Sequence, residues 1–358
     1  MTLSLPPASV TVLIVEDSPV IAESLAAVLR SDPAIRVVGI AADAETAVQA
    51  ARRLRPSVIT MDIHLPSING FEATRRIMET CPTPIVIVSG SLGASDGPDK
   101  LHAVAVGAVA TVAPPRPIDD PAYAESARQL VETIKLMSEV RVVRRWPRAI
   151  AAAVPVPVPV PADRAAWSAQ RVRAIAIGAS TGGPLVLQSL LAALPPNLSA
   201  PVLIVQHMTP GFVESFVDWL AQSSGFPVHV AGHGQALLPG HAYVAPDGRH
   251  MGVQHGGRIV LSDAPPENGM RPAVSFLFRS LAATLAPHVV AVMLTGMGRD
   301  GVDELKRLKE AGALTIAQDE NSSVVFGMPG QAVEAGAVSH VLPPDAIAGL
   351  LASITFTP

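Results

Sequence analysis

The amino-acid sequence predicts two α/β domains, each built around a mainly parallel β-sheet, with a proline-rich linker between them. In both halves, short and almost continuously apolar segments alternate with segments of helical spacing, which is typical of strands buried on both faces of a sheet. Between the halves, Ala149–Pro161 alternates Val with Pro and cannot be helical, because proline lacks an amide hydrogen and disfavours helix in the preceding residue. We place the domains at residues 9–145 and 170–356, with the linker at 146–169.

The first domain contains five apolar segments that we expect to be strands. Between them lie helical patterns, such as Ser18–Arg30 and the alanine-rich Ala44–Leu54, in which apolar residues recur every three or four positions. This alternation predicts a doubly wound, five-stranded parallel sheet. The expected strands are Thr11–Val15, Arg36–Ile40, Val58–Met61, Ile85–Val88 and Val109–Val112.

The second domain repeats this pattern on a larger scale and is also predicted to be doubly wound. From Pro227 to Ser262 the pattern changes to short strands broken by Gly and Pro, which predicts a small antiparallel hairpin region attached to the parallel core. The expected core strands are Val172–Ile177, Val202–Val205, Val289–Leu294 and Leu314–Ala317. The expected helices are Leu185–Leu194, Gly211–Ala221, Val274–Leu285 and Gly301–Glu310.

The composition excludes several classes of protein. Of the 358 residues, 49% are hydrophobic and 16% charged, and the net charge of −4 gives no basic excess for nucleic acid. The sequence contains no apolar stretch of the roughly 18 residues that span a bilayer and no signal-peptide pattern at its start. The single cysteine, Cys81, excludes a disulfide framework and a cysteine-rich metal site. We therefore expect a cytoplasmic protein that neither binds nucleic acid nor inserts into a membrane.

Polar residues follow three of the predicted strands in the first domain. Glu16 and Asp17 come after the first strand, Asp62 after the third and Ser89 after the fourth. Ligands gather at the carboxyl ends of parallel strands, and three carboxylates there can hold Mg²⁺ beside a phosphoryl group. The structural alternative is that Asp17 or Ser18 caps the next helix and the acids face solvent.

A Ser, a His and an Asp each follow a predicted strand of the second domain. Ser180 lies in the strand-to-helix turn GASTGGP, where the helix N-terminus favours a developing oxyanion. A serine hydroxyl needs a base, which His207 can provide, and Asp300 can orient the imidazole. The alternative is that Ser180 and Asp300 only cap helices and that His207 is a polar residue at a strand end.

Two other kinds of site fit the second domain less well. The turn GASTGGP does not match G-x-G-x-x-G, and the next strand ends in Gln206-His207 rather than in an acid, which disfavours a dinucleotide site. The histidines between His229 and His255 lack an HExxH pattern, which disfavours a metal site. We expect no cofactor in this domain and expect His250 to line the substrate groove.

These motifs resemble a known family. VEDS, MDIHLPSINGFE and VSG, at residues 15–18, 61–72 and 88–90, are similar to a response-regulator receiver. IGASTGGP, QHMTPGFVESF, YVAPDGRHM, RPAVSFLFRS, LTGMGRDG and TIAQDENSSVVFGMP, between Ile177 and Pro329, resemble the catalytic domain of chemotaxis protein-glutamate methylesterases. The order receiver, linker, esterase is also that of the family.

The resemblance implies a hydrolase that cleaves glutamate methyl esters, and deamidates certain glutamines, on the cytoplasmic domains of methyl-accepting chemoreceptors. It implies that Ser180 is the nucleophile, His207 the base and Asp300 the third member of a triad. Thr181 neighbours the nucleophile, and the backbone at Met297 is expected to form part of the oxyanion hole.

For the first domain, the resemblance implies that Asp62 accepts a phosphoryl group from the chemotaxis histidine kinase. It also implies that Glu16, Asp17 and Asp62 bind Mg²⁺ and that Ser89 is the switch hydroxyl. The unphosphorylated receiver is expected to inhibit the esterase.

The sequence departs from the family in two places. The usual receiver lysine is replaced by Pro114 and the usual aromatic residue by Thr111, although Arg116 lies two residues beyond Pro114. Many relatives have Ser at the position of Ala273, a change that we do not expect to inactivate the esterase. Weakened phosphorylation control is therefore expected. The alternative function is a non-enzymatic signalling regulator or docking protein with a degenerate receiver.

Overall fold

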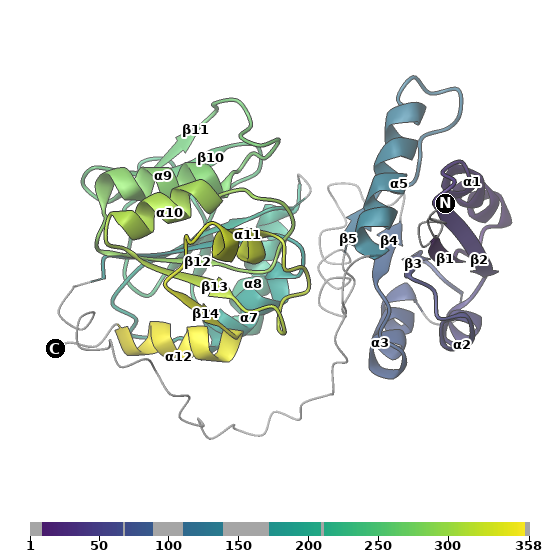
Figure 1. Cartoon of the computed structure of the whole chain (residues 1–358), viewed down its shortest axis with the longest axis horizontal. Coiled ribbons are helices and arrows are strands. Elements are labelled where there is room, and N and C mark those ends of the chain that lie inside the picture. Colours follow the sequence, from purple (N-terminus) through teal and green to yellow (C-terminus); the bar gives the residue numbers. More distant parts are fainter. Residues whose placement is uncertain (1–8, 67–68, 89–109, 139–171, 209–210, 355–358) are drawn as a thin grey trace, which may run out of the picture. The chain divides into compact units, whose positions relative to one another are not determined.

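The computed structural model describes residues 9–66, 69–88, 110–138, 172–208 and 211–354. The chain divides into two compact units, Met1–Ala151 and Ala152–Pro358 (Figure 1). Ser89 and the expected linker, residues 146–169, lie outside the described residues. The expected domain boundaries therefore stay a prediction.

The first unit is the predicted α/β domain with a five-stranded sheet in the order β2-β1-β3-β4-β5. All neighbouring strands are parallel, and β3 and β4 have the predicted bounds. Their side chains are buried throughout, as expected for strands covered on both faces. The strands are β1 Val10–Val15, β2 Ile35–Ala41, β3 Val58–Met61, β4 Ile85–Val88 and β5 Ala110–Val112.

Helices cover both faces of this sheet. Helices α1 and α5 contact each other on one face, and α2 and α3 contact each other on the other (Figure 1). Ser18 caps α1 by accepting a hydrogen bond from the amide of Ile21, so the capping alternative is correct for that residue. The helices are α1 Pro19–Arg30, α2 Ala44–Leu54, α3 Gly70–Thr80 and α5 Tyr123–Ser138.

The second unit contains a seven-stranded sheet in the order β14-β13-β12-β6-β7-β9-β8. Every neighbouring pair in it is parallel. The strands from the predicted core are β6 Ala174–Ala179, β7 Val202–Gln206, β12 Val289–Met293 and β13 Leu314–Gln318. The shorter strands are β8 Val228–Val230, β9 Ala242–Val244 and β14 His340–Leu342.

The expected hairpin region is smaller than the sequence suggested. Strands β10 His250–Gln254 and β11 Arg258–Ser262 form an antiparallel pair across the turn at Gly256-Gly257. Strands β8 and β9, by contrast, join the main sheet in parallel. The eleven connecting residues, 231–241, bring the chain back to the end of the sheet at which β8 began, so that β9 runs in the same direction as β8. A tight hairpin turn would make the two strands antiparallel.

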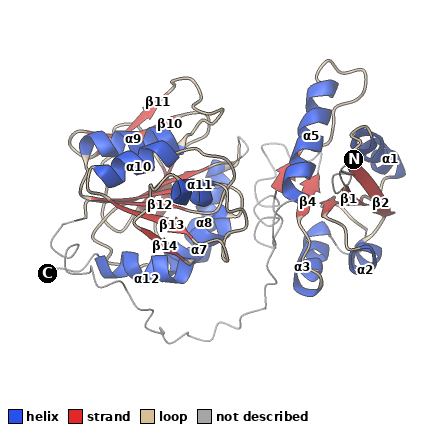
Figure 2. Cartoon of the chain, viewed as in Figure 1, coloured by secondary structure: helices blue, strands red, loops and turns tan. Residues whose placement is uncertain are grey.

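The six helices that the structure describes in the second unit form two groups, shown in blue in Figure 2. Helix α7 contacts α8 and α12, whereas α10 contacts α9 and α11, and β10 packs on α9. Helix α7 begins at Gly183, two residues before the predicted start, because Pro184 is tolerated in the first helical turn. The helices are α7 Gly183–Ala193, α8 Val213–Ser224, α9 Val274–Thr284, α10 Val302–Glu310, α11 Met328–Glu334 and α12 Pro344–Ile354.

Both sheets reverse their strand order at the strands that precede the candidate residues. In the first sheet β1 lies between β2 and β3, and in the second β6 lies between β12 and β7. Such switch points are where open α/β sheets bind ligands beyond the carboxyl ends of their strands. Among the described residues, no helix has the length and apolar character needed to cross a bilayer.

Candidate active site

The register of three adjacent strands brings the predicted Ser and His to the same edge of the second sheet. Ala179 at the end of β6 pairs with Gln206 at the end of β7. One residue further, the amide of His207 donates to the carbonyl of Ala179 at 2.9 Å. On the other side of β6, the amide of Ser180 donates to the carbonyl of Thr295 at 3.0 Å. Ser180 therefore lies between the segments that follow β7 and β12.

The imidazole of His207 pairs with the carboxylate of Asp300. Nε2 of His207 lies 2.9 Å from Oδ2 of Asp300, and both side chains are buried. Nδ1 of His207 is also buried and has no hydrogen-bond partner among the described residues. When Nε2 carries its proton toward Asp300, Nδ1 presents a lone pair, which is the requirement for a general base.

The carboxylate of Asp300 accepts hydrogen bonds on both oxygens. Besides His207, Oδ2 accepts from the amide of Val274 at 2.6 Å. Oδ1 accepts from the amide and the hydroxyl of Ser275 at 3.0 and 2.5 Å. Burial raises the pKa of the Asp300 carboxyl, but the hydrogen bonds from His207 and Ser275 outweigh it and hold that pKa below its usual value. The group is therefore a buried carboxylate at neutral pH.

The turn that carries Ser180 depends on two glycines. Gly182 has a φ of +81°, and a Cβ there would lie 2.6 Å from the side chain of Val324. A Cβ on Gly183 would lie 2.1 Å from Oε1 of Gln206. The turn that carries Ser180, here called the nucleophile turn, can therefore pack against Val324 and Gln206 only because neither glycine has a side chain.

Unused backbone donors lie beside Ser180. The amides of Thr181, Gly182 and Met297 donate no hydrogen bond within the part of the chain that the structure describes. The first two precede α7, whose N-terminus carries a partial positive charge. These are the donors that an oxyanion requires. The Ser180 hydroxyl, which is partly exposed, makes no hydrogen bond to His207 within these described segments.

Gln206 holds the nucleophile turn to the strand that carries the base, a role that the sequence did not suggest. Its side chain is buried, and Nε2 donates to the carbonyls of Ser180 at 2.9 Å and His207 at 2.8 Å. In the sequence it stood out only as a polar residue at the end of an apolar strand.

Thr295 is a second buried polar residue that the sequence did not single out. Its hydroxyl donates to the carbonyl of Thr181 at 2.9 Å and accepts from the amide of Val325 at the same distance. Its own amide donates to Oε1 of the buried Gln318. These contacts connect the nucleophile turn to the segment that precedes α11.

The prediction that His250 lines a substrate groove is wrong. Its side chain is completely buried, stacks on Phe276, and uses both ring nitrogens in hydrogen bonds to the carbonyl of Pro265 and the amide of Ala273. His229 and His241 hydrogen-bond to each other at 2.8 Å. Within the described segments, the one cluster of potential metal ligands lies in the first unit.

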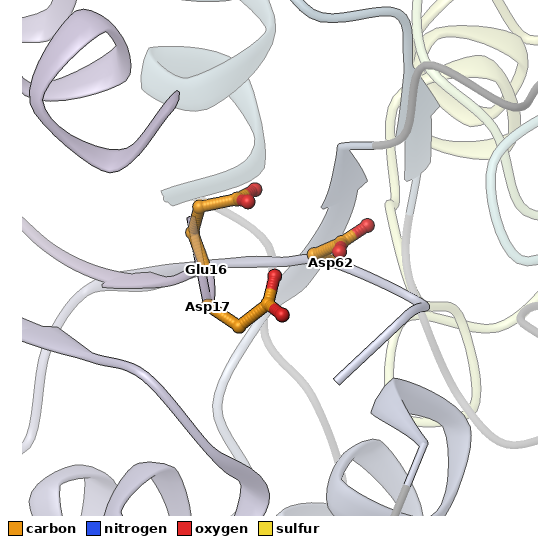
Figure 3. A group of neighbouring side chains, drawn as sticks. All are labelled: Glu16, Asp17 and Asp62. Carbon is orange, nitrogen blue, oxygen red and sulfur yellow. The ribbon is translucent and has the colours of Figure 1, made fainter. Parts of the chain in front are cut away.

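That cluster is the predicted acidic site at the carboxyl ends of β1 and β3. Potential ligand oxygens of Glu16, Asp17 and Asp62 lie within 4.8 Å of one another (Figure 3). Burial, followed by the charge of Asp62, raises the pKa of Glu16 to about 7 against a hydrogen bond from the amide of Ser18. Burial also raises the pKa of Asp62. A hard divalent cation fits three crowded carboxylates and would offset the repulsion between their negative charges.

Arg116, two residues beyond Pro114, forms no ion pair with the acidic cluster within the described residues, so its substitution for the missing lysine stays a prediction. Its amide donates to Oγ of Ser126, and its guanidinium is exposed. Within the described residues, the charge of His64 acts on Asp62 and opposes the rise of its pKa.

Comparisons with known proteins find a separate family match in each of the two units. The model of the CheB methylesterase family matches residues 175–351, and that of the response regulator receiver domain matches residues 12–120. The protein-glutamate methylesterase/protein-glutamine glutaminase 4 of Geobacter metallireducens is 51% identical over 346 residues, which cover 96% of this chain and 99% of the relative. A Nitrosospira multiformis protein of the same name is 50% identical over 347 residues, covering 96% and 97%.

A solved structure is similar to the second unit. The Thermotoga maritima CheB methylesterase catalytic domain is 37% identical, with a TM-score of 0.50, and the match covers 51% of this chain and 98% of that one. Relatives that are 50% and 51% identical cover almost the whole chain. The chain therefore belongs to the protein-glutamate methylesterase/protein-glutamine glutaminase family, in which a receiver domain precedes a CheB methylesterase domain.

Proposed function

We propose that this enzyme hydrolyses glutamate methyl esters on the cytoplasmic domains of chemoreceptors, with Ser180 as nucleophile, and that it deamidates glutamines there by the same acyl chemistry. The observation that carries the proposal is the buried His207–Asp300 pair, which leaves Nδ1 of His207 without a partner one strand away from Ser180. A buried carboxylate that fixes the tautomer of a histidine beside a serine is the arrangement that activates a serine hydroxyl.

In the first half of the reaction, Nδ1 of His207 takes the proton of the Ser180 hydroxyl while its oxygen attacks the ester carbonyl. The negative charge that develops on the carbonyl oxygen is stabilised by the unused amides of Thr181 and Met297. When the tetrahedral species collapses, the bond to methoxide breaks and His207 returns the proton, so methanol leaves and an acyl-serine remains.

In the second half, His207 takes a proton from water as the hydroxide attacks the acyl carbonyl. Collapse of this species breaks the bond to the Ser180 oxygen, which regains the proton from His207, and a glutamate carboxylate is released. Asp300 keeps its negative charge throughout and stabilises the imidazolium that forms twice in the cycle.

We further propose that Asp62 accepts a phosphoryl group from a histidine kinase with Mg²⁺ held by Glu16, Asp17 and Asp62. The crowded carboxylates support this assignment, because a divalent cation offsets the charge of the phosphoryl group as well as their own. Pro114 supplies no ammonium group to the phosphoryl oxygens, so phosphorylation biases the esterase only weakly.

The test is methanol release from methylated receptor cytoplasmic fragments. Ser180→Ala is expected to reduce the rate by about 10⁴-fold or more while the circular dichroism stays native. Ser189→Ala, which changes an exposed serine on α7, is the matched control and should keep the wild-type rate. A Ser180→Ala rate above a tenth of wild type would overturn the nucleophile assignment, and no release by the wild type would favour the non-enzymatic docking function.

A further inference from the structure

Helix α9 begins without a capping side chain of its own. Its N-cap residue is Ala273, which has no hydrogen-bonding group, although the first amides of a helix need acceptors. The acceptor is the carboxylate of Asp300, which receives the amides of Val274 and Ser275. The N-terminus of α9 therefore holds the carboxylate that pairs with His207.

The hydroxyl of Ser275 adds a contact whose direction is fixed. It accepts a hydrogen bond from the amide of Gly301 at 2.9 Å, which leaves its single proton for Oδ1 of Asp300 at 2.5 Å. The residue is 3% exposed, so water does not compete for either contact. Ser275 thus joins the start of α9 to the start of α10 across the carboxylate.

We propose that Ser275 is a positioning residue that sets the proton affinity of His207 through Asp300. Its hydroxyl holds Oδ1, which turns Oδ2 toward Nε2 of His207, and it withdraws negative charge from the carboxylate. A less basic carboxylate binds the imidazolium less tightly, so His207 gives up its proton more readily to the leaving group. The inference rests on the proposed roles of His207 and Asp300.

Other charged groups near these elements form no ion pair with His207 or Asp300 within the described segments. Arg279 on α9 pairs with Glu267 and Glu304, and Arg299 pairs with Asp303. Glu214 and Asp218, on the α8 that follows β7, form no ion pair with His207. Within the described segments, Asp300 is the charged group that contacts both His207 and Ser275.

The test is Ser275→Ala in the full-length enzyme, with Ser280→Ala as the matched control. Ser280 lies on the same helix, and its hydroxyl also makes two hydrogen bonds, to the carbonyl of Leu277 and from the amide of Val253. It does not contact Asp300 or His207 among the described residues. Ser280 is partly buried, so any general effect of removing a hydrogen-bonded hydroxyl from α9 should appear in both variants.

The readout is the ¹⁵N-NMR titration of the imidazole of His207, compared with the pH profile of kcat/KM. Without the Ser275 hydroxyl, Asp300 is more basic, so the midpoint of both curves should move to higher pH by about 0.5–1 unit, a three- to tenfold change in proton affinity. Ser275→Cys, which keeps the shape but is a weaker donor, should fall between serine and alanine. Ser280→Ala should leave the midpoint unchanged.

A midpoint that stays within about 0.2 units of wild type in natively folded Ser275→Ala would overturn the proposal. So would an equal shift in Ser280→Ala, which would make the effect a general response of the helix. The NMR titration requires no substrate and no turnover. If Ser180→Ala kept full activity, the proposed nucleophile would be wrong, while the titration would still decide the role of Ser275.

Discussion

Replacing Asp300 with Asn is the sharpest test of whether this carboxylate acts on His207 or only caps α9. Each of its oxygens accepts from two donors, so an amide nitrogen at either position would face an N–H group. At the position of Oδ2, the amide would donate to Nε2 of His207 and move the imidazole proton to Nδ1. The nitrogen that should receive the Ser180 proton would then already carry one.

The expected loss follows from that change of tautomer. We predict that kcat for methanol release falls by about 10⁴-fold, equivalent to about 5.5 kcal/mol of transition-state stabilisation. Since Asp300 also caps α9, the free energy of unfolding should fall by about 1–2 kcal/mol. A residue that only capped the helix would show the second effect without the first.

The assay combines single-turnover methanol release with urea unfolding of the full chain. The matched control is Asp303→Asn, which changes an exposed acid on α10 that pairs with Arg299 at the surface, and should alter neither quantity appreciably. A kcat for Asp300→Asn within tenfold of wild type, in a protein with lowered stability, would refute the triad and leave Asp300 as a helix cap.

Three further predictions concern Gln206 and the acidic cluster of the first unit. Gln206→Leu removes two hydrogen bonds that hold Ser180 to the strand carrying His207, so kcat should fall by about 10²-fold with native circular dichroism; an unchanged kcat would contradict its positioning role. Acetyl phosphate with Mg²⁺ should raise methanol release less than about threefold, and not at all in Asp62→Ala; an Asp62-dependent rise of tenfold would contradict the weak switch. Because the pKa of Glu16 is raised to about 7, the native state binds more protons than the unfolded state between pH 4.5 and 7. Hydrogen exchange without metal should therefore show the free energy of opening of β1 and β3 falling by up to about 3 kcal/mol as the pH rises through this range. In Glu16→Gln this free energy should stay constant, and a flat profile in the wild type would contradict the prediction.

The sequence predicted the strands best where both faces are buried. Val58–Met61 and Ile85–Val88 have the predicted bounds, because every side chain in them is apolar or buried and proline or polar residues flank them. The same logic placed Glu16, Asp17 and Asp62 at one edge of the first sheet, and Ser180 and His207 at one edge of the second. It could not show that β8 and β9 run parallel, because strand direction depends on the path of the connecting segment 231–241.

The buried polar residues around the candidate site were beyond sequence reasoning. Ser275 contacts a residue 25 positions away, and Thr295 one 114 positions away. No local sequence pattern predicts either contact, because each depends on how the ends of two strands and the start of a helix meet in the fold. His250 shows the reverse error: its motif suggested a groove residue, but stacking on Phe276 and two hydrogen bonds satisfy a histidine in the core.

If His207 activates Ser180 as a nucleophile, Ser180 should react with a serine-directed covalent probe. The wild-type enzyme is treated with a fluorophosphonate and the modified residue is located by peptide mass spectrometry. We predict stoichiometric modification of Ser180, a rate that falls by at least about 10²-fold in His207→Gln, and no modification in Ser180→Ala. Labelling of a different serine, or an undiminished rate in His207→Gln, would show that His207 does not activate Ser180.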